Sequence, residues 1–420
     1  MAALGGLRRA LSHRNARVFF GGSLVAWTGL WMHRIAVAWL AWELTGNAAW
    51  VGVVAFCDLA PAVIVSPFAG AVADRVDRVR LSMVTQAVIA LQAAAVATLA
   101  ATGSMTIGLL LVLEVCGGTA ASFAQPARQT LMPGIVARAD LPAAVALNSL
   151  VFAVSRFTGP ALAGPVIAVW GVAPAIAANA VAYLIACLSL LMLTIAPAER
   201  HGHAATGHSL WAEVVQGLRY AARHIGLGPL LAYAAFTAML LRAMQEILPP
   251  YVDRLFGRGA ESLAVLTACF GIGALFAGLW VANRGTLEGT TRLAIWSALL
   301  QAAGVTLFVA TGWFPLGMAS AAVIGASASM HGISVQTLIQ SATDPEFRGR
   351  MLSLWGLITR AFPALGALAL GIAGEVFGLR IPTLVAVGLF LGVFAWGLSR
   401  LGTMQRALEG GPPVPRRDRE

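Results

Sequence analysis

The sequence predicts an all-α integral membrane protein with twelve transmembrane helices, arranged as two six-helix lobes related by pseudo-symmetry. Of its 420 residues, 59% are hydrophobic and 11% are charged, whereas a soluble domain carries about 25% charged residues. Its continuous apolar runs are each long enough to cross a hydrocarbon core of about 30 Å as a helix. An internal repeat divides these runs into two halves. These observations exclude a water-soluble globule, and the continuity of the runs excludes a membrane barrel, whose strands alternate polar with apolar residues.

The predicted spans divide the chain into two lobes, a linker and two tails. A cytoplasmic tail covers residues 1–17, the N-terminal lobe 18–195, a cytoplasmic linker 196–226, the C-terminal lobe 227–400 and a disordered cytoplasmic tail 401–420. Apolar residues at helical spacing in the linker predict an amphipathic helix on the membrane surface; they are Leu210, Val214, Val215, Leu218 and Ala222. The predicted spans are 18–43, 48–71, 80–101, 105–127, 142–169, 172–195, 227–251, 261–282, 292–311, 315–340, 350–377 and 380–400.

The basic residues determine the predicted orientation. All 28 are arginine, and the absence of lysine excludes a phosphate-binding P-loop and Schiff-base catalysis. In the predicted topology 21 of the 28 lie on the side of both termini, against three on the other side. The positive-inside rule then places both termini in the cytoplasm, and the expected location is the inner (cytoplasmic) membrane. The net charge of +10 therefore indicates no nucleic-acid partner.

The two halves repeat each other at an offset close to half the chain. Residues 129–131 (QTL) recur at 336–338 after 207 residues. Two arginines within the predicted spans, Arg34 and Arg156, recur as Arg242 and Arg360 after 208 and 204 residues. Six helices per half make the repeats parallel, which predicts a two-lobed secondary transporter with its site between the lobes near the midplane.

The loop between the second and third predicted spans carries a charged motif. Residues 70–80 read GAVADRVDRVR. The expected conformational latch consists of Gly70, Asp74, Arg75 and Arg78, whose charges can hold neighbouring helix ends together. This motif resembles the loop signature of the major facilitator superfamily. It departs from the commonest form, having Asp77 where a glycine is usual and Val79 in place of a second basic residue.

The fifth predicted span reads RFTGPALAGP from Arg156 to Pro165. Its glycines, Gly159 and Gly164, permit close helix packing, and Pro160 and Pro165 each remove a backbone donor. The run resembles the antiporter signature of the superfamily. With residues 123–129 and 146–149, it is similar to the branch of enterobactin exporters and macrolide efflux pumps. The resemblance implies export driven by the proton gradient, with no bound cofactor and a monomeric protein in the bilayer.

Ionisable residues inside spans are costly, so each requires a reason. Arg34 with Asp58 is one expected pair, Arg242 with Glu246 at i,i+4 is another, and Glu114 is expected to face Arg156. One interpretation is that these pairs only neutralise charge and fix packing. The other is that a carboxylate exchanges protons with the two sides in turn, with Asp58 as first choice and Glu114 as second. The proton-coupling and cavity candidates are His33, Arg34, Asp58, Glu114, Arg156, Arg242, Glu246 and Arg360.

The transported molecule is expected in a cavity lined by predicted helices 1, 4, 7 and 10. Candidate substrate contacts are Trp27, Trp31, Gln245 and His331. Four arginines against three acids within the spans favour an anionic or zwitterionic molecule such as a siderophore. Predicted helices 3, 6, 9 and 12 have no interior charge and are expected to face lipid. The four cysteines lie in apolar interiors without metal-ligand spacing, so no metal site is expected.

The leading hypothesis is an exporter that moves a siderophore, macrolide or other amphiphilic small molecule in exchange for protons. An importer or lysophospholipid flippase of the same fold remains an alternative. A transport-inactive membrane receptor or assembly protein is an alternative of another class, although it would not need a charged midplane. Catalytic and nucleotide-binding motifs are missing, which argues against an enzyme or an ATP-driven pump.

Overall fold

The computed structural model describes residues 9–137, 140–194, 210–344 and 346–410. Within these ranges it contains twelve helical spans long and apolar enough to cross a membrane, which confirms the predicted fold class. The first lobe consists of α2 (Arg14–Thr45), α3 (Ala48–Arg75), α4 (Arg78–Ala101), α5 (Ile107–Ile135), α6 (Leu141–Trp170) and α7 (Val172–Leu191). The second lobe follows α9 (Leu210–Arg223) and comprises α10 (Leu227–Thr237), a π-helical turn η2 (Ala238–Arg242), α11 (Ala243–Glu246), α12 (Leu248–Phe256), α13 (Ala260–Arg284), α14 (Thr290–Ala310), α15 (Phe314–Ala342), α16 (Arg348–Phe377) and α17 (Arg380–Glu409).

Short polar caps separate the long helices. Asn47 accepts hydrogen bonds from the backbone of Ala49 and Trp50 at the start of α3, and Asp77 caps α4 in the same way. The joint between the last two helices of each lobe is made by a glycine with positive φ, Gly171 in the first lobe and Gly378 in the second. The internal repeat therefore extends to the backbone conformation of this joint.

The seventh span is broken, which the sequence analysis did not predict. A continuous helix was expected over 227–251, but the chain forms α10, the wider turn η2, α11 and then α12. Ile247, with φ −118° and ψ 40°, interrupts the helix just before Leu248-Pro249-Pro250. Proline supplies no backbone donor and restricts the residue before it, which explains a helix break at this position.

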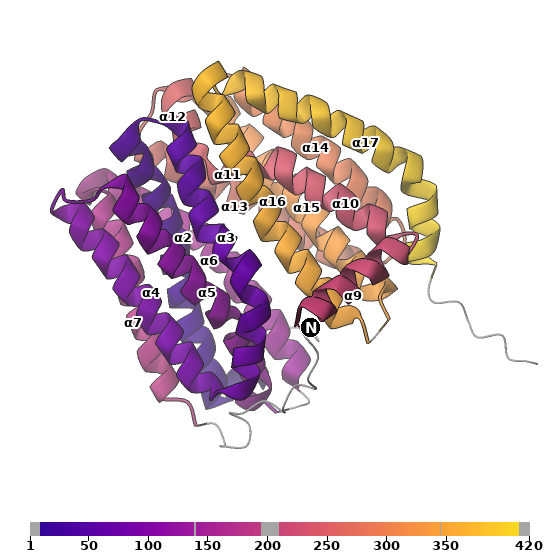
Figure 1. The fold of residues 1–420 in the computed structure, drawn as a ribbon, viewed down its shortest axis with the longest axis horizontal. Helices are drawn as coiled ribbons and strands as arrows, with labels where there is room; N and C mark the ends of the chain where they lie inside the picture. Colours follow the sequence, from indigo (N-terminus) through magenta and orange to yellow (C-terminus); the bar gives the residue numbers. More distant parts are fainter. Residues whose placement is uncertain (1–8, 138–139, 195–209, 345, 411–420) are drawn as a thin grey trace, which may run out of the picture.

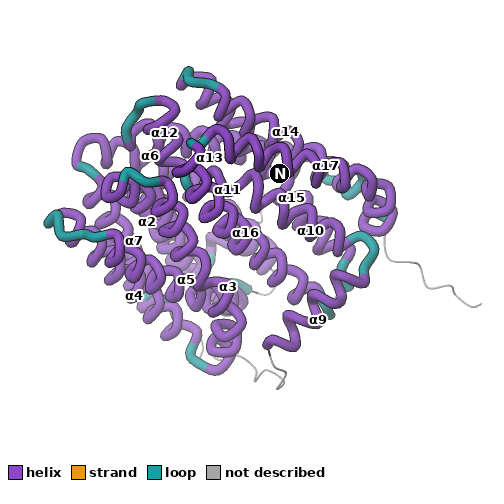
Figure 2. The backbone as a smooth tube through the Cα atoms, turned by 45° about the horizontal axis from the view of Figure 1, so that its top comes forward, coloured by secondary structure: helices purple, strands orange, loops and turns teal. Residues whose placement is uncertain are grey.

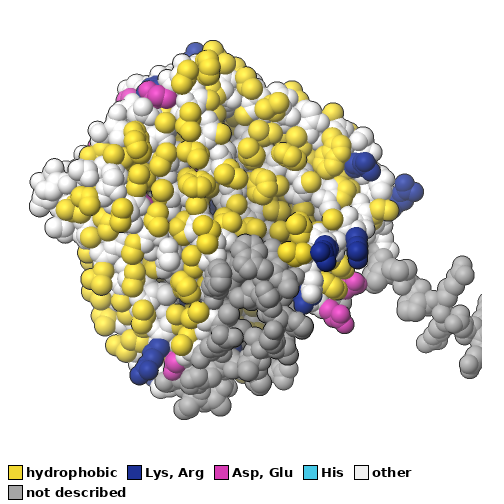
Figure 3. All heavy atoms as spheres, viewed as in Figure 1, with side chains coloured by type: hydrophobic (Ala, Val, Ile, Leu, Met, Phe, Trp, Pro, Cys, Tyr) yellow, Lys and Arg dark blue, Asp and Glu magenta, His cyan; other side chains and the backbone are white. Residues whose placement is uncertain are grey.

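The lobes meet along two helix pairs, α3 with α16 and α6 with α13. Figure 1 shows α3 and α16 side by side between the two lobes, and Figure 2 shows the same order of helices from another side. Helices α4, α7, α14 and α17 lie at the periphery, where they expose large apolar side chains such as Leu91, Leu188, Leu307 and Leu389. Figure 3 shows apolar side chains over most of the visible surface, as a lipid-facing protein requires.

The lobes are closed on one side of the molecule. The terminal face is here the side where α2 begins and α17 ends, and the opposite face is the side of the joints 46–47 and 378–379. At the opposite face, a Cβ added to Gly371 of α16 would lie 2.6 Å from the carbonyl oxygen of Ala48 in α3. The Ala48 amide donates to Glu375 at 2.9 Å, and Arg254 donates to Glu375 at 3.0 Å and to the Gly46 carbonyl at 2.9 Å. Because Arg254 and Glu375 are each about a third exposed, their ion pair stabilises the contact between the lobes by at most about 1 kcal/mol. The packing of α3 against α16 is therefore the main interaction that holds the opposite face closed.

Candidate functional site

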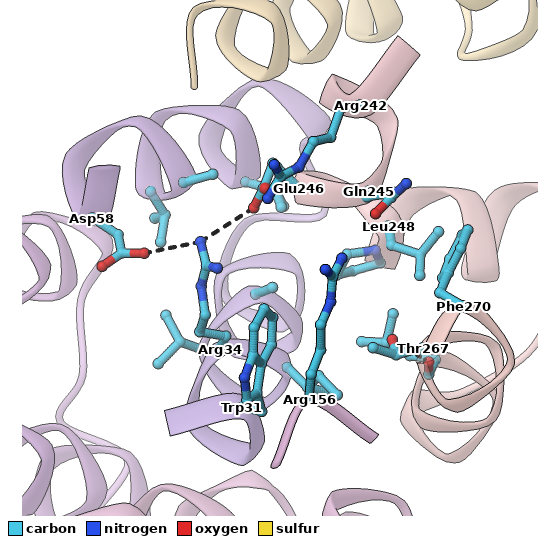
Figure 4. Close-up of a pocket in the computed structure, with 18 of the residues that line it drawn as sticks. Trp31, Arg34, Asp58, Arg156, Arg242, Gln245, Glu246, Leu248, Thr267 and Phe270 are labelled. Atoms are coloured by element: carbon cyan, nitrogen blue, oxygen red, sulfur yellow. Dashed lines mark hydrogen bonds and ion pairs between the residues drawn. The ribbon is translucent and has the colours of Figure 1, made fainter. Parts of the chain in front are cut away.

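A cavity of about 110 Å³ lies between the two lobes. The first lobe contributes residues of α2, α3, α5 and α6, and the second contributes residues of η2, α11, α12 and α13 (Figure 4). Its charged and polar lining residues are Arg34, Asp58, Glu114, Arg156, Arg242, Gln245, Glu246 and Thr267, with the indole of Trp31 beside them. None of its described lining residues belongs to α15, so the expected contribution of predicted helix 10 was wrong, and α3, α6 and α13 line the cavity in addition.

Arg34 joins two carboxylates from different lobes. Its Nη2 lies 3.2 Å from Oδ2 of Asp58 on α3 and 3.3 Å from Oε2 of Glu246 on α11. Figure 4 shows the guanidinium between the two acids. The expected Arg34–Asp58 pair is therefore present. The bond to Glu246 crosses between the lobes, so the strength of an inter-lobe contact depends on how Asp58 and Glu246 share one cation.

The expected pair of Arg242 with Glu246 is not formed. The two side chains have no ion-pair contact within 4 Å in the described structure, and Glu246 contacts Arg34 instead. The i,i+4 prediction assumed a regular α-helix. Here the π-helical turn ends at Arg242 and the helix breaks again at Ile247, so the two residues do not lie on one regular helix face.

Glu114 of α5 contacts neutral or titratable donors rather than an arginine. Its Oε1 lies 3.3 Å from Nε2 of His33 on α2 and 3.0 Å from Nε2 of Gln92 on α4. The side chains of Glu114 and His33 are only 6% and 7% exposed. The expectation that Glu114 pairs with Arg156 was wrong, because α2 and α4 enclose Glu114 inside the first lobe. Gln92 was missed, although a polar residue inside an apolar span gives the same signal as a charged one.

Trp31 lies between two arginines. The guanidinium carbons of Arg34 and Arg156 are 5.5 and 5.4 Å from the ring centroid of Trp31, within the range of cation–π attraction. Figure 4 shows the indole between these two side chains. Trp31 therefore keeps both cations oriented along the cavity.

Several candidates lie elsewhere. Trp27 is buried against Phe152 and beneath the guanidinium of Arg128, 4.4 Å from the ring centroid, and does not line the cavity. His331 is buried in the second lobe, where Nδ1 lies 2.8 Å from the carbonyl oxygen of Ala294. Arg360 and His33 are not lining residues either. These four residues were chosen because they are aromatic or ionisable residues inside predicted spans, and that criterion does not determine the direction in which a side chain faces.

The two sequence motifs occupy different positions. Of the expected latch, Arg78 begins α4. The surroundings of Gly70 and the side chains of Asp74 and Arg75 lie outside the described part of the structure. In α6, Pro160 and Pro165 lie inside the helix. A Cβ on Gly159 would meet Thr28 and Trp31 of α2, and one on Gly164 would lie 2.7 Å from the Cβ of Ala264 in α13. The motif glycines therefore bring α6 close to a helix of each lobe.

The described residues contain no group of three or more His, Cys, Asp or Glu side chains placed to hold a metal ion.

The model of the transmembrane secretion effector family matches residues 9–415. The chain belongs to this family of the major facilitator superfamily. It is 25% identical to the multidrug efflux pump Tap of Mycolicibacterium fortuitum, over 92% of this chain and 96% of that protein. It is 19% identical to macrolide efflux protein A of Streptococcus pyogenes, over 83% of this chain and 86% of that protein. It is also 31% identical to the staphyloferrin A transporter of Staphylococcus aureus, over 42% of this chain and 45% of that protein, so this match spans about half of each chain.

Solved transporter structures share the fold. A bacterial homologue of the human lysosomal transporter Spinster, in an inward-facing and unoccupied conformation, superposes with a TM-score of 0.73 at 13% identity, over 95% of this chain and 99% of that one. The nucleoside transporter NupG superposes with a TM-score of 0.69 at 15% identity, over 92% and 99%. The family member described here is a multi-pass membrane transporter and not an enzyme, as the sequence predicted.

Proposed function

We propose that this transporter exports a small amphiphilic molecule from the cytoplasm in exchange for protons, by alternating access. Relatives named as multidrug and macrolide efflux proteins support the direction, and a relative named as a siderophore transporter extends the range of molecules. In this proposal the protein is a monomer of the inner membrane, with both termini in the cytoplasm. The terminal face is then cytoplasmic, and closure at the opposite face makes this an inward-facing conformation.

The observation that carries the proposal is the sharing of Arg34 between Asp58 and Glu246. Arg34 and Asp58 belong to the first lobe, whereas Glu246 belongs to the second. When Asp58 is ionised, it competes with Glu246 for the guanidinium. When Asp58 takes up a proton, this competition ends and the inter-lobe bond from Arg34 to Glu246 strengthens. Protonation at one site thereby changes the attraction between the lobes, which is what coupling requires.

Asp58 suits the proton-carrying role better than Glu114. Both acids line the cavity, but the Asp58 side chain is 30% exposed, so water can deliver and remove its proton. Glu114 is nearly enclosed and accepts a hydrogen bond from Gln92. A carboxylate that exchanges its proton with both sides must reach water in each conformation.

The test is uptake into energised inside-out membrane vesicles, which reports export. The panel holds a catecholate siderophore, a macrolide and a lipophilic dye, each measured with and without a proton uncoupler. We expect uncoupler-sensitive uptake of at least one compound and a loss of at least tenfold in Asp58→Asn. Asp253→Asn, which changes an exposed aspartate of α12, is the matched control and should transport normally.

Each alternative has its own result. Uptake that survives Asp58→Asn would make Asp58 structural and contradict the coupling scheme. Transport only in right-side-out vesicles would indicate an importer, and movement of lysophospholipid alone would indicate a flippase. Absence of transport in every condition would favour the receptor or assembly role.

A further inference from the structure

The charges around the cavity are unevenly paired. Three arginines and three carboxylates line it, but Asp58 and Glu246 both contact Arg34, and Glu114 contacts His33 and Gln92. Of the residues that the structure describes, none supplies Arg156 or Arg242 with a carboxylate within 4 Å. Glu246 attracts both side chains only from beyond contact distance, and its carboxylate is already in contact with Arg34. A partly buried cation without a carboxylate in contact is unfavourable, so these two side chains favour the binding of an anion.

Trp31 and Gln245 line the same space. Both residues line the cavity together with Arg156 and Arg242, and Figure 4 shows Arg156 and Gln245 at the same side of it. The indole Nε1 of Trp31 and the amide Nε2 of Gln245 are themselves buried atoms, so these two nitrogens are not open to the cavity. The guanidinium groups of Arg156 and Arg242 are therefore the donors that the cavity offers to a ligand.

We propose that Arg156 and Arg242 bind an oxyanion, a carboxylate or phosphate group of the transported molecule. This inference rests on the proposed transport function and specifies the chemistry of its substrate. The planar guanidinium matches both oxyanions with two parallel hydrogen bonds. The oxyanion site is distinct from the Arg34 network, whose cation already has two carboxylate partners.

The rest of the lining defines the rest of the ligand. Val54, Leu248, Leu263 and Phe270 form apolar walls beside the donors. A volume of about 110 Å³ is smaller than the roughly 300–1,000 Å³ of a site that encloses a drug-sized ligand. In this conformation the cavity accommodates an anionic head group, and an apolar body requires further space between the lobes. The expected ligand is an amphiphilic anion.

The two arginines also come from different lobes. Arg156 lies on α6 and Arg242 on η2, and like charges repel each other across the cavity. An anion between them replaces this repulsion with two attractions. Binding therefore favours a conformation in which both lobes contact the ligand, as alternating access requires.

The test uses three probes with one aromatic body and different head groups: pyrenebutyrate, its methyl ester and pyrenebutylamine. Binding is measured on the full chain in phosphatidylcholine nanodiscs, with empty nanodiscs subtracted. We expect pyrenebutyrate to bind at least tenfold more tightly than the ester or the amine. Arg156→Gln and Arg242→Gln should each weaken pyrenebutyrate about tenfold or more, the loss expected for one charge-assisted hydrogen bond, and leave the ester unchanged.

Matched variants separate binding from folding. Arg292→Gln, which changes an exposed arginine of α14, should retain the full preference for the acid. Arg156→Lys and Arg242→Lys keep the charge and should retain part of it, and each variant is checked by thermal unfolding. Equal binding of acid and ester by the wild type, or a preference that survives in both glutamine variants, would overturn the proposal.

A final comparison identifies the source of the anion. Phosphatidylglycerol is added to the nanodiscs to test whether its phosphate competes with pyrenebutyrate. If it weakens pyrenebutyrate binding equally in the wild type and in Arg292→Gln but not in Arg242→Gln, the site binds a lipid phosphate; if it weakens binding in none of them, the site binds a soluble anion. A larger effect in the wild type than in Arg292→Gln would indicate general surface charge, which the proposal does not predict. Because this assay needs neither a proton gradient nor a transport direction, its result is independent of the vesicle experiment.

Discussion

At the scale of single residues, Glu114 is the most deeply enclosed acid of the charged layer. It contacts His33 and Gln92 from two neighbouring helices, and its side chain is 6% exposed. A buried carboxylate in this position satisfies donors that would otherwise have no partner. Its first role is therefore to join α2, α4 and α5 within the first lobe, whereas the side chain of Asp58 is more exposed to the cavity.

This assignment predicts different effects for two substitutions of Glu114. Glu114→Leu leaves the donors of Gln92 and His33 without an acceptor, so we expect the free energy of unfolding to fall by about 1–3 kcal/mol. Glu114→Gln keeps an acceptor oxygen and should cost less than half as much. Equilibrium unfolding in mixed micelles measures both. If the leucine variant were as stable as the wild type, the structural role of Glu114 would be wrong.

The sequence located the charged layer but not its pairing. Arg34, Asp58, Glu114 and Arg242 were placed near the midplane from their distance to the helix ends, and all four line the cavity. Partners depend on the direction in which each residue faces, which depth does not give. Glu246 was assigned to Arg242 on the assumption of a regular helix, and η2 removes that regularity.

At the scale of elements, the opposite face is closed by the packing of α3 on α16. Gly371 is a point of close approach that a single substitution can test, since any added Cβ would meet the carbonyl of Ala48. We expect Gly371→Leu to separate these helix ends and to increase the population that is open at the opposite face. An introduced cysteine at Val54, in a background without the four native cysteines, should then react several-fold faster with an impermeant maleimide added from that face.

Gly388→Leu is the matched control for this prediction. Gly388 lies on the exposed surface of α17, and a Cβ added there would have no neighbour within 4 Å. Its labelling should equal that of the unsubstituted background. Unchanged labelling in Gly371→Leu would show that the exposed Arg254–Glu375 pair, and not helix packing, determines the closure.

Hydropathy predicted the existence of every span, because each must bury its backbone in lipid and remain apolar over its length. It did not predict the break in the seventh. The residues Pro249 and Pro250 were visible in the sequence, but they were included in a continuous span because the surrounding residues are apolar. A pair of prolines near one end of a span is a local signal that should outweigh average hydropathy.

At the scale of the whole molecule, the internal repeat explains where the site lies. Arg34 and Arg242 are separated by 208 residues in the sequence and line one cavity between the lobes. The equivalent joints at Gly171 and Gly378 share a positive φ. The repeat could be recognised from the sequence because it preserves spacing, whereas the closure at one face could not, since both conformations of a two-lobed transporter use the same spans.

The arginine distribution predicts the orientation of this closed face. Of 28 arginines, 21 lie on the terminal side in the predicted topology, so the positive-inside rule places that side in the cytoplasm. We expect green fluorescent protein fused after residue 420 to be fluorescent and alkaline phosphatase fused there to be inactive. Phosphatase fused after Arg258, on the opposite face, should be active. The reverse pattern would make the structure outward-facing and would contradict the proposed inward-facing conformation, in which Asp58 is reached from the cytoplasm.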